Sequence, residues 1–359
     1  MAAEGQRSAT VELLSLARDE LERLVQAWGA QRYRADQIWH WLYRRLAQSP
    51  LEMGNLPAAL RERLAAETVV GGLEPLRLLE AEDGLTSKVL LRLADGAAVE
   101  AVLMRYGEGD DATERDTVCA SSQVGCAIGC AFCATGQQGW TRDLTAGEIA
   151  AQVLHFEREL RAEGAHVTNV VLMGMGEPLL NRDAVWRAIR NLNDPDGLGL
   201  GARRFTVSTA GIVPGILAMA TEEMPAVGLA VSLHAPDNGL RDTLVPINRR
   251  YPLEALLAAC ERYVSATGRR VTMEYALIDG VNDSPGHARR TADLLGGLLC
   301  HVNLIPLNPT EGCDLQPAPP ERVARFRDVL RRAGIPVTVR LRRGVDVQAG
   351  CGQLCGQRR

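Results

Sequence analysis

The chain has 359 residues, of which 46% are hydrophobic and 23% are charged, and its net charge is −4. These values are typical of a globular protein with one large domain and a smaller one, and they do not indicate a nucleic-acid binder. No apolar run is long enough for a signal peptide or a membrane span, so we expect a cytoplasmic protein with no membrane partner. In that compartment the nine cysteines suit metal binding or catalysis better than static disulfides.

Residues 1–70 are predicted to form a small helical domain. Apolar residues recur at helical spacing over 11–21 and 35–44, and a third helix is expected over about 57–64. Aromatic and arginine side chains are interspersed here, namely Trp28, Tyr33, Trp39, Trp41 and Tyr43 with Arg32, Arg34, Arg44 and Arg45. Two interpretations are open: a surface that stacks on RNA, or a small helical core with solvated arginines, which is the commoner arrangement.

A β-hairpin is expected next. Its strands, over 87–93 and 98–106, flank a turn at Asp95 and Gly96. Glu100 stands inside the second strand, so its carboxylate either faces water or looks into a cavity. The strand pattern alone favours water.

From residue 117 onward, strands and helices alternate. Strands are expected over 117–121, 167–173, 205–209, 227–233, 271–277 and 302–306. Helices are expected between them, including helices that begin at Thr145, Asn181 and Ser284, and a helix over 320–332 leads to a last strand over 337–341. Six or more such units indicate a parallel sheet curved into a full or partial barrel, with the functional site at the carboxyl ends of the strands.

A C-x3-C-x2-C run, formed by Cys126, Cys130 and Cys133, follows the first of these strands. A closed zinc site needs four ligands, and no fourth Cys or His follows within the next twenty residues. Three cysteines on a [4Fe–4S] cluster would leave one iron open for chemistry. The run is typical of radical S-adenosylmethionine (SAM) enzymes, whereas ferredoxins space their cysteines differently. Unrelated thiols, or a zinc site completed from elsewhere in the chain, are the alternatives.

Polar or glycine-rich features follow four further strands. They include Gly176, Glu177, Ser208, Ser232, His234 and Asn308. Gly176 and Glu177 suit an ammonium group, because they offer carbonyl and carboxylate acceptors on a tight turn. The others could bind a ribose and an amino acid, although His234 on its own would more often be a structural histidine.

Two features of the remaining chain are notable. Residues 321–359 contain ten arginines and three acidic residues, which indicates either a basic face or a solvated helix surface. Cys351 lies between Gly350 and Gly352, so we expect its thiol on a mobile loop that can reach a pocket. Cys119 ends the first strand of the alternating region and should lie beside the same site.

Together these residues resemble the RlmN/Cfr family of radical SAM RNA adenine methyltransferases, and most of all its C2-methylating members. The resemblance rests on the segments 119–126, 132–133, 137–139, 173–181, 232–236, 303–309 and 351–354, and it extends over essentially the whole chain. It implies a partial (β/α)6 radical SAM barrel. The implied divisions are a helical RNA-binding domain (1–70), a linker with a β-hairpin (71–112), the barrel (113–345) and a C-terminal loop (346–359).

The resemblance also implies roles for individual residues. A [4Fe–4S] cluster would be held by Cys126, Cys130 and Cys133. SAM would be contacted by Gly176, Glu177, Ser208, Ser232, Leu233, His234 and Asn308. Cys351 would carry the methyl group, Cys119 would resolve the intermediate through a transient disulfide, and Glu100 would accept the ring proton, which reverses the water-facing interpretation of Glu100.

The implied reaction uses two SAM molecules. The first methylates Cys351, and the second yields a 5′-deoxyadenosyl radical that takes hydrogen from this methyl group, so that the resulting radical adds to adenine. The implied partners are 23S rRNA, tRNA and an external flavodoxin-like or ferredoxin-like electron donor, and the protein is expected to be a monomer.

Two alternative functions stay open. Members of the Cfr type methylate C8 of the same rRNA adenine with the same cysteines, so only general resemblance favours C2. A non-catalytic iron–sulfur protein that binds RNA is a different class, but it would have no use for Cys351 or the strand-end residues. One departure from the family is Cys355, where alanine is frequent. This second mobile thiol either competes with Cys119 for the disulfide or does nothing.

Overall fold

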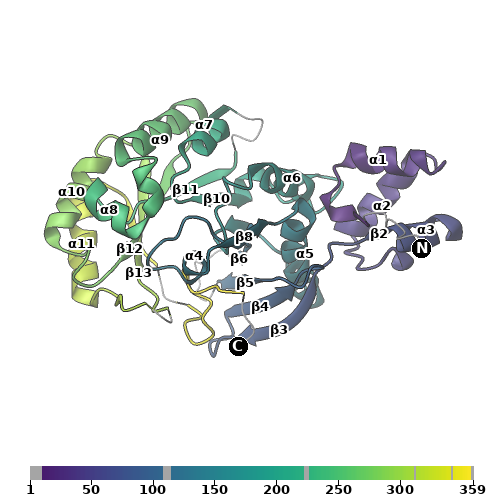
Figure 1. Cartoon of the computed structure of the whole chain (residues 1–359), viewed down its shortest axis with the longest axis horizontal. Coiled ribbons are helices and arrows are strands. Elements are labelled where there is room, and N and C mark those ends of the chain that lie inside the picture. Colours follow the sequence, from purple (N-terminus) through teal and green to yellow (C-terminus); the bar gives the residue numbers. More distant parts are fainter. Residues whose placement is uncertain (1–9, 108–114, 222–225, 311–312, 341–342, 357–359) are drawn as a thin grey trace, which may run out of the picture.

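The computed structural model describes residues 10–107, 115–221, 226–310, 313–340 and 343–356 of the chain. Its N-terminal unit lies at the right of Figure 1 and contains β1 (Val11–Glu12), η1 (Leu13–Ser15), α1 (Arg18–Ala27), α2 (Tyr33–Tyr43), η2 (Pro50–Glu52), α3 (Ala58–Glu67) and β2 (Thr68–Val69). The helices predicted over 35–44 and 57–64 are confirmed as α2 and α3.

The helix predicted over 11–21 is wrong in its first half. Strand β1 pairs in parallel with β2, η1 follows it, and α1 begins only at Arg18. The Glu20 carboxylate accepts the N–H of Ala17 at 2.8 Å and caps the helix there. The apolar spacing before Arg18 reflects instead a buried turn, in which Leu13 and Leu14 are almost fully buried.

The aromatic side chains of this unit divide between core and surface. Trp39 and Tyr43 are buried, and their ring centroids lie 4.5 Å apart. Tyr33 is 46% exposed, and the guanidinium of Arg34 lies 4.6 Å from the centroid of its ring. The helical-core interpretation is therefore confirmed for the buried pair, whereas stacking on RNA stays a prediction for the exposed side chains.

A ten-stranded sheet forms the body of the molecule (Figure 1). In spatial order its strands are β14 (Val337–Val339), β13 (Cys300–Pro306), β12 (Val271–Leu277), β11 (Gly228–Ser232), β10 (Phe205–Thr209), β9 (Asn169–Leu172), β6 (Arg115–Cys119), β5 (Ala98–Tyr106), β4 (Thr86–Arg92) and β3 (Glu74–Glu80). Every pair from β6 to β14 is parallel, and β5, β4 and β3 extend the β6 side as an antiparallel meander. Strands β3 and β14 are the edges of this sheet, so the barrel is open.

Helices cover the outer side of the parallel strands in Figure 1. They are α5 (Ala146–Ala162), α6 (Arg182–Asn193), α7 (Val213–Thr221), α8 (Asn238–Leu244), α9 (Leu253–Thr267), α10 (Pro285–Leu295) and α11 (Pro320–Arg332). The predicted cap at Thr145 is confirmed, because its hydroxyl accepts the N–H of Glu148 at 3.0 Å. In the described part of the chain, no helix is both long and apolar enough to cross a bilayer.

The predicted α/β class, parallel sheet and hairpin are confirmed. The hairpin strands are β4 and β5, and the six strands predicted between 117 and 306 match β6 and β9 to β13 within two residues. Strand β14 ends at Val339, and residue 341 of the predicted last strand lies outside the described residues. The sequence patterns do not predict β3, because its residues are mostly exposed and offer no alternating apolar face. The sequence patterns also do not predict the short antiparallel pair of β7 (Gln123–Gly125) and β8 (Trp140–Asp143). The cysteine loop and α4 (Ala134–Gln137) lie between these two strands in the chain.

The guanidinium of Arg241, on α8, fastens the carboxyl ends of two neighbouring parallel strands. It is fully buried and donates to the carbonyl oxygens of Ala210, Ser232 and Leu233 at 2.7, 2.8 and 3.0 Å. A fourth bond, of 2.9 Å, goes to the side chain of Asn248. Ser232 ends β11, and Ala210 and Leu233 directly follow β10 and β11, so a single side chain donates to three buried carbonyls at the strand ends.

Replacing Arg241 with methionine should destabilise the protein strongly. The change would leave four buried acceptors without a donor, so we expect the free energy of unfolding to fall by about 3 kcal/mol. Urea unfolding followed by circular dichroism measures this value. The exposed Arg249 supplies the control, because Arg249→Met should stay within about 0.5 kcal/mol of the wild type. Equal effects of the two substitutions would contradict the role given to Arg241.

Candidate active site

One pocket lies at the carboxyl ends of the parallel strands, and we call it the strand-end pocket. The predicted site residues that line it are Cys126, Cys130, Cys133, Gly176, Glu177, Ser208, Ser232, His234, Asn308 and Cys351. They come from the ends of β6, β9, β10, β11 and β13 and from the C-terminal segment. Leu233 is not part of the lining, because its side chain is fully buried beside the pocket. The strand-end rule therefore brings together residues that are up to 225 positions apart, from Cys126 to Cys351.

The three cysteines of the loop after β6 meet in this pocket. Burial raises the pKa of each thiol, to about 12 for Cys126, and charge repulsion from the neighbouring sulfurs adds to the rise for Cys130. Sulfurs in such surroundings become thiolates when a cationic centre binds them. Among the described residues, no group of three or more His, Cys, Asp or Glu side chains could hold a single metal ion. The three thiols that line this pocket are the donors it offers to a metal group.

Glu177 is a buried carboxylate, and no cationic side chain of the described residues pairs with it. Its oxygens accept the N–H groups of Leu179 and Ala210 at 3.1 and 2.6 Å. Burial nevertheless raises the pKa of Glu177 to about 7. At Gly176, φ is +100° and an added Cβ would lie 2.6 Å from the Cβ of Gln123, so this turn requires glycine. A ligand that brings an ammonium group would stabilise the charged carboxylate.

His234 has a structural hydrogen bond and also lines the pocket. Its Nδ1 accepts the N–H of Ala276 at 2.9 Å, so the proton of the neutral ring sits on Nε2. Burial lowers the pKa of His234 to about 3, which keeps the ring neutral at physiological pH. The Phe132 ring, from the cysteine loop, meets it edge-to-face with centroids 4.8 Å apart. His234 therefore packs the cysteine loop against the end of β11.

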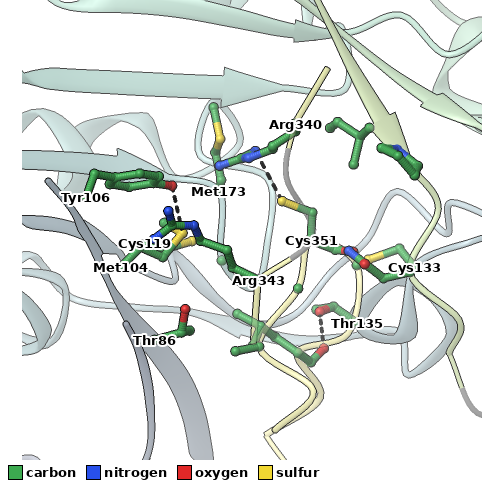
Figure 2. Close-up of a pocket in the computed structure, with 18 residues that line it drawn as sticks. Thr86, Met104, Tyr106, Cys119, Cys133, Thr135, Met173, Arg340, Arg343 and Cys351 are labelled. Atoms are coloured by element: carbon green, nitrogen blue, oxygen red, sulfur yellow. Dashed lines mark hydrogen bonds between the residues drawn. The ribbon is translucent and has the colours of Figure 1, made fainter. Parts of the chain in front are cut away.

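A second pocket adjoins the first, and we call it the thiol pocket (Figure 2). Cys119 and Cys351 both line it, and Cys133, Asn308 and Arg340 border both pockets. Arg340 donates to the Cys351 sulfur at 3.3 Å, as Figure 2 shows. Burial raises the pKa of the Cys119 thiol to about 12, so this thiol is protonated at neutral pH.

The loop that carries Cys351 is held in place at several points. The Asn308 amide donates to the Cys351 carbonyl at 3.2 Å, and the Thr135 hydroxyl donates to the Leu354 carbonyl at 2.5 Å. An added Cβ on Gly350 would lie 2.5 Å from the Asn308 amide nitrogen, and φ of Gly352 is +85°. The two glycines therefore permit close packing and a turn. In this structure they hold the thiol of Cys351 at the pocket rather than leave its loop loose.

Glu100 lies in neither pocket. It is 4% exposed, so the interpretation in which its carboxylate faces water is wrong. Its Oε1 is 3.0 Å from the Nζ of Lys88, and both residues border a third cavity of about 640 Å³, which we call the hairpin cavity. Cys355 is also buried and borders the hairpin cavity, not the thiol pocket. In this structure Cys355 is therefore on the far side of the C-terminal segment from Cys119, and its competition with Cys119 stays a prediction.

The arginines of residues 321–359 do not form one basic face among the described residues. Arg322 pairs with Asp279 and Asp283 at 2.8 and 3.0 Å on the outside of the barrel. Arg340, by contrast, is directed into the site, and Arg343 lines the thiol pocket. Charge counting cannot separate these environments. The strand-end rule could have indicated Arg340, because this residue directly follows β14.

The comparisons with known proteins agree with this geometry. Residues 11–70 match the ribosomal RNA large subunit methyltransferase N-terminal domain, and residues 121–292 match the radical SAM superfamily. The chain is 48% identical to "Dual-specificity RNA methyltransferase RlmN 1" of Myxococcus xanthus, over 96% of this chain and 94% of that protein. It is 51% identical to "Probable dual-specificity RNA methyltransferase RlmN" of Moorella thermoacetica, over 96% and 97%. The crystal structure of a radical SAM methyltransferase from Sphaerobacter thermophilus superposes with a TM-score of 0.93 at 53% identity, over 97% of this chain and all of that one.

Proposed function

Since this chain belongs to the RlmN family of radical SAM RNA methyltransferases, we propose that it methylates carbon 2 of an adenine in 23S rRNA and in tRNA. The observation that carries the proposal is the joining of the two pockets. Three cysteines of the radical SAM motif lie in one pocket, two further cysteines lie in the other, and Cys351 borders both. An enzyme that only transferred a methyl group from SAM to a nucleophilic base would have no need for Cys119 or Cys351 beside the motif.

The residues present fit the cofactors of this family. Cys126, Cys130 and Cys133 offer three sulfurs in one pocket, the donor set that would hold a [4Fe–4S] cluster. Glu177 is buried without a cationic partner among the described residues and would accept the SAM ammonium. Gly176, Ser208, Ser232, His234 and Asn308 line the same pocket, and Leu233 adjoins it, so these residues complete the proposed SAM site. When bound there, the cluster supplies the electron that starts radical chemistry on SAM, and an external flavodoxin-like or ferredoxin-like protein would deliver it.

Cys351 and Cys119 would then determine what is made. Cys351 would carry the methyl group, because its sulfur borders the strand-end pocket and receives a hydrogen bond from Arg340. Once this group is joined to the adenine, the Cys119 sulfur would attack the Cys351 sulfur, forming a disulfide and breaking the bond between sulfur and carbon. The protonated, buried state of Cys119 would prevent an earlier attack. Glu100 would accept the ring proton.

A pair of arginines beside the thiol pocket supports an anionic substrate. The guanidinium groups of Arg115 and Arg343 lie 4.5 and 4.7 Å from the centroid of the Tyr106 ring. Tyr106 and Arg343 line the pocket, as Figure 2 shows. Neither arginine forms an ion pair with an acidic side chain of the described residues. Two guanidinium groups on one ring offer the donors and the charge that a backbone phosphate of RNA would need. In the N-terminal domain, exposed Tyr33 with Arg34 offers a further stacking contact.

Substituting the two thiols of the thiol pocket separately should give different outcomes. With cluster, SAM and reductant present, Cys351→Ala should abolish methylation, whereas Cys119→Ala should accumulate a covalent complex of protein and RNA. Denaturing gels and mass spectrometry of the RNA distinguish the two results. Cys260, which is buried in α9, serves as the control, because Cys260→Ala should retain activity. Turnover by Cys351→Ala, or normal product release by Cys119→Ala, would contradict the assigned roles.

Removing the proposed phosphate contact should weaken RNA binding and reduce its dependence on salt. For Arg343→Gln we expect the slope of log K against log salt concentration to decrease in magnitude by about 1. Fluorescence anisotropy with an unmodified rRNA transcript measures the slope. Arg250 stacks on Tyr251 at 5.3 Å and lines neither pocket, so Arg250→Gln is the matched control and should keep the wild-type slope. An unchanged slope for Arg343→Gln would rule out the contact.

A further inference from the structure

Lys88 is the only lysine of the chain, and it is buried on β4. Its Nζ lies 3.0 Å from Oε1 of Glu100 and donates to the carbonyl oxygen of Gln348 at 3.2 Å. The side chains of Lys88 and Glu100 are only 7% and 5% exposed. One ammonium group therefore connects the hairpin to the C-terminal loop in surroundings where a lone charge would be costly.

The other oxygen of Glu100 holds the end of the same loop. Oε2 accepts the backbone N–H groups of Cys355 and Gly356 at 2.7 and 3.3 Å. With Lys88 on Oε1, the carboxylate has a cation and two amides as partners. While these contacts persist, both oxygens of the carboxylate are occupied by groups of the protein and neither is turned to a substrate.

The C-terminal segment also separates Glu100 from the two thiols. Leu354 lines the thiol pocket, whereas the next residue, Cys355, lines the hairpin cavity together with Glu100. Residues 354–356 therefore form part of the wall between the carboxylate and Cys351. In this structure the wall lies between an adenine held at Cys351 and the Glu100 carboxylate.

We propose that residues 354–356 are a latch, a segment that is closed when it is bound to Glu100 and open when it is released. Lys88 is the positioning residue, because it holds the Glu100 carboxylate in both states. In the closed state observed here, Glu100 binds the amides of Cys355 and Gly356. When RNA enters, these amides leave Glu100, and the ammonium of Lys88 keeps the carboxylate in place for the substrate. The contact between Lys88 and the Gln348 carbonyl holds the near end of the loop, so the motion is confined to the segment after Gln348.

This inference rests on the proposed RNA substrate and on the role of Glu100 as proton acceptor, but part of it can be tested without either. Hydrogen exchange with mass spectrometry on the full-length, cofactor-loaded protein reports the amides of Cys355 and Gly356. In the absence of RNA, Lys88→Met should speed their exchange at least about tenfold, because Glu100 loses the ion pair that orients it. Lys88→Arg keeps the charge and should restore slow exchange. The amide of Glu148, held by the Thr145 hydroxyl, is the internal reference and should not change.

The second measurement adds an unmodified rRNA transcript to the wild type. The latch predicts that exchange at residues 355–356 becomes faster on RNA binding, although most contacts of a bound ligand slow exchange. If the transcript binds and these amides stay protected, the latch is wrong. If the transcript does not bind, the proposed substrate is wrong instead, and the comparison of Lys88→Met with Lys88→Arg alone decides whether Lys88 holds the latch.

Single-turnover methylation separates positioning from a merely structural role. Lys88→Met should lower the rate at saturating RNA at least about tenfold while leaving RNA affinity within about threefold, and Lys88→Arg should recover most of the rate. The control is Glu157→Gln, which alters another buried carboxylate, paired with Arg161 in α5, and should keep the wild-type rate. If Lys88→Met does not fold, Glu100→Gln makes the same prediction for exchange at 355–356. Loss of affinity with an unchanged rate would overturn the positioning role.

Discussion

The backbone of residues 350–356 is hydrogen-bonded to three separate parts of the fold, and the position of Cys351 depends on this junction. The Gly352 carbonyl accepts the N–H of Ala134 at 2.8 Å, at the start of α4 directly after Cys133, and Asn308 after β13 donates to the Cys351 carbonyl at 3.2 Å. On the hairpin side, Glu100 accepts the amide of Cys355 at 2.7 Å. The motif cysteines, the proposed SAM pocket and the hairpin are thereby joined by one short loop. A structural change in any of the three parts should alter the position of the Cys351 thiol.

Burial shifts the pKa values of several side chains at this site. The open barrel places Glu177, His234 and Arg340 in surroundings with little water, where burial raises the pKa of Glu177 to about 7 and lowers that of His234 to about 3. A buried carboxylate is stabilised in its charged form by a cationic ligand, so an ammonium group is favoured beside Glu177. Burial also raises the pKa of Cys119 to about 12 and keeps it a thiol, which agrees with the late step proposed for it. The fold therefore places a buried, protonated thiol, Cys119, in the same pocket as Cys351.

Much of the fold and of the candidate site could be predicted from the sequence, because both depend on regular patterns. The strand-end rule located Glu177, His234 and Asn308 correctly at one pocket. The side on which Glu100 lies could not be predicted, because strand alternation does not reveal that the chain folds a second layer, containing Cys355, over that face. The positions of Arg340 and Lys88 depend on partners elsewhere in the chain, Cys351 and Glu100, which are 11 and 12 residues away. Strand β1 forms where a helical turn was expected because it pairs with β2, which is remote in sequence.

The central claim is that this arrangement of cysteines directs radical chemistry to carbon 2 of an adenine in RNA. The most direct measurement is mass spectrometry of nucleosides from unmodified 23S rRNA that has been treated with the reconstituted enzyme, SAM and reductant. The account predicts 2-methyladenosine, formed only when Cys351 is present. Formation of 8-methyladenosine instead would contradict the proposed site of methylation, and RNA binding with no methylated adenine would contradict the catalytic account as a whole.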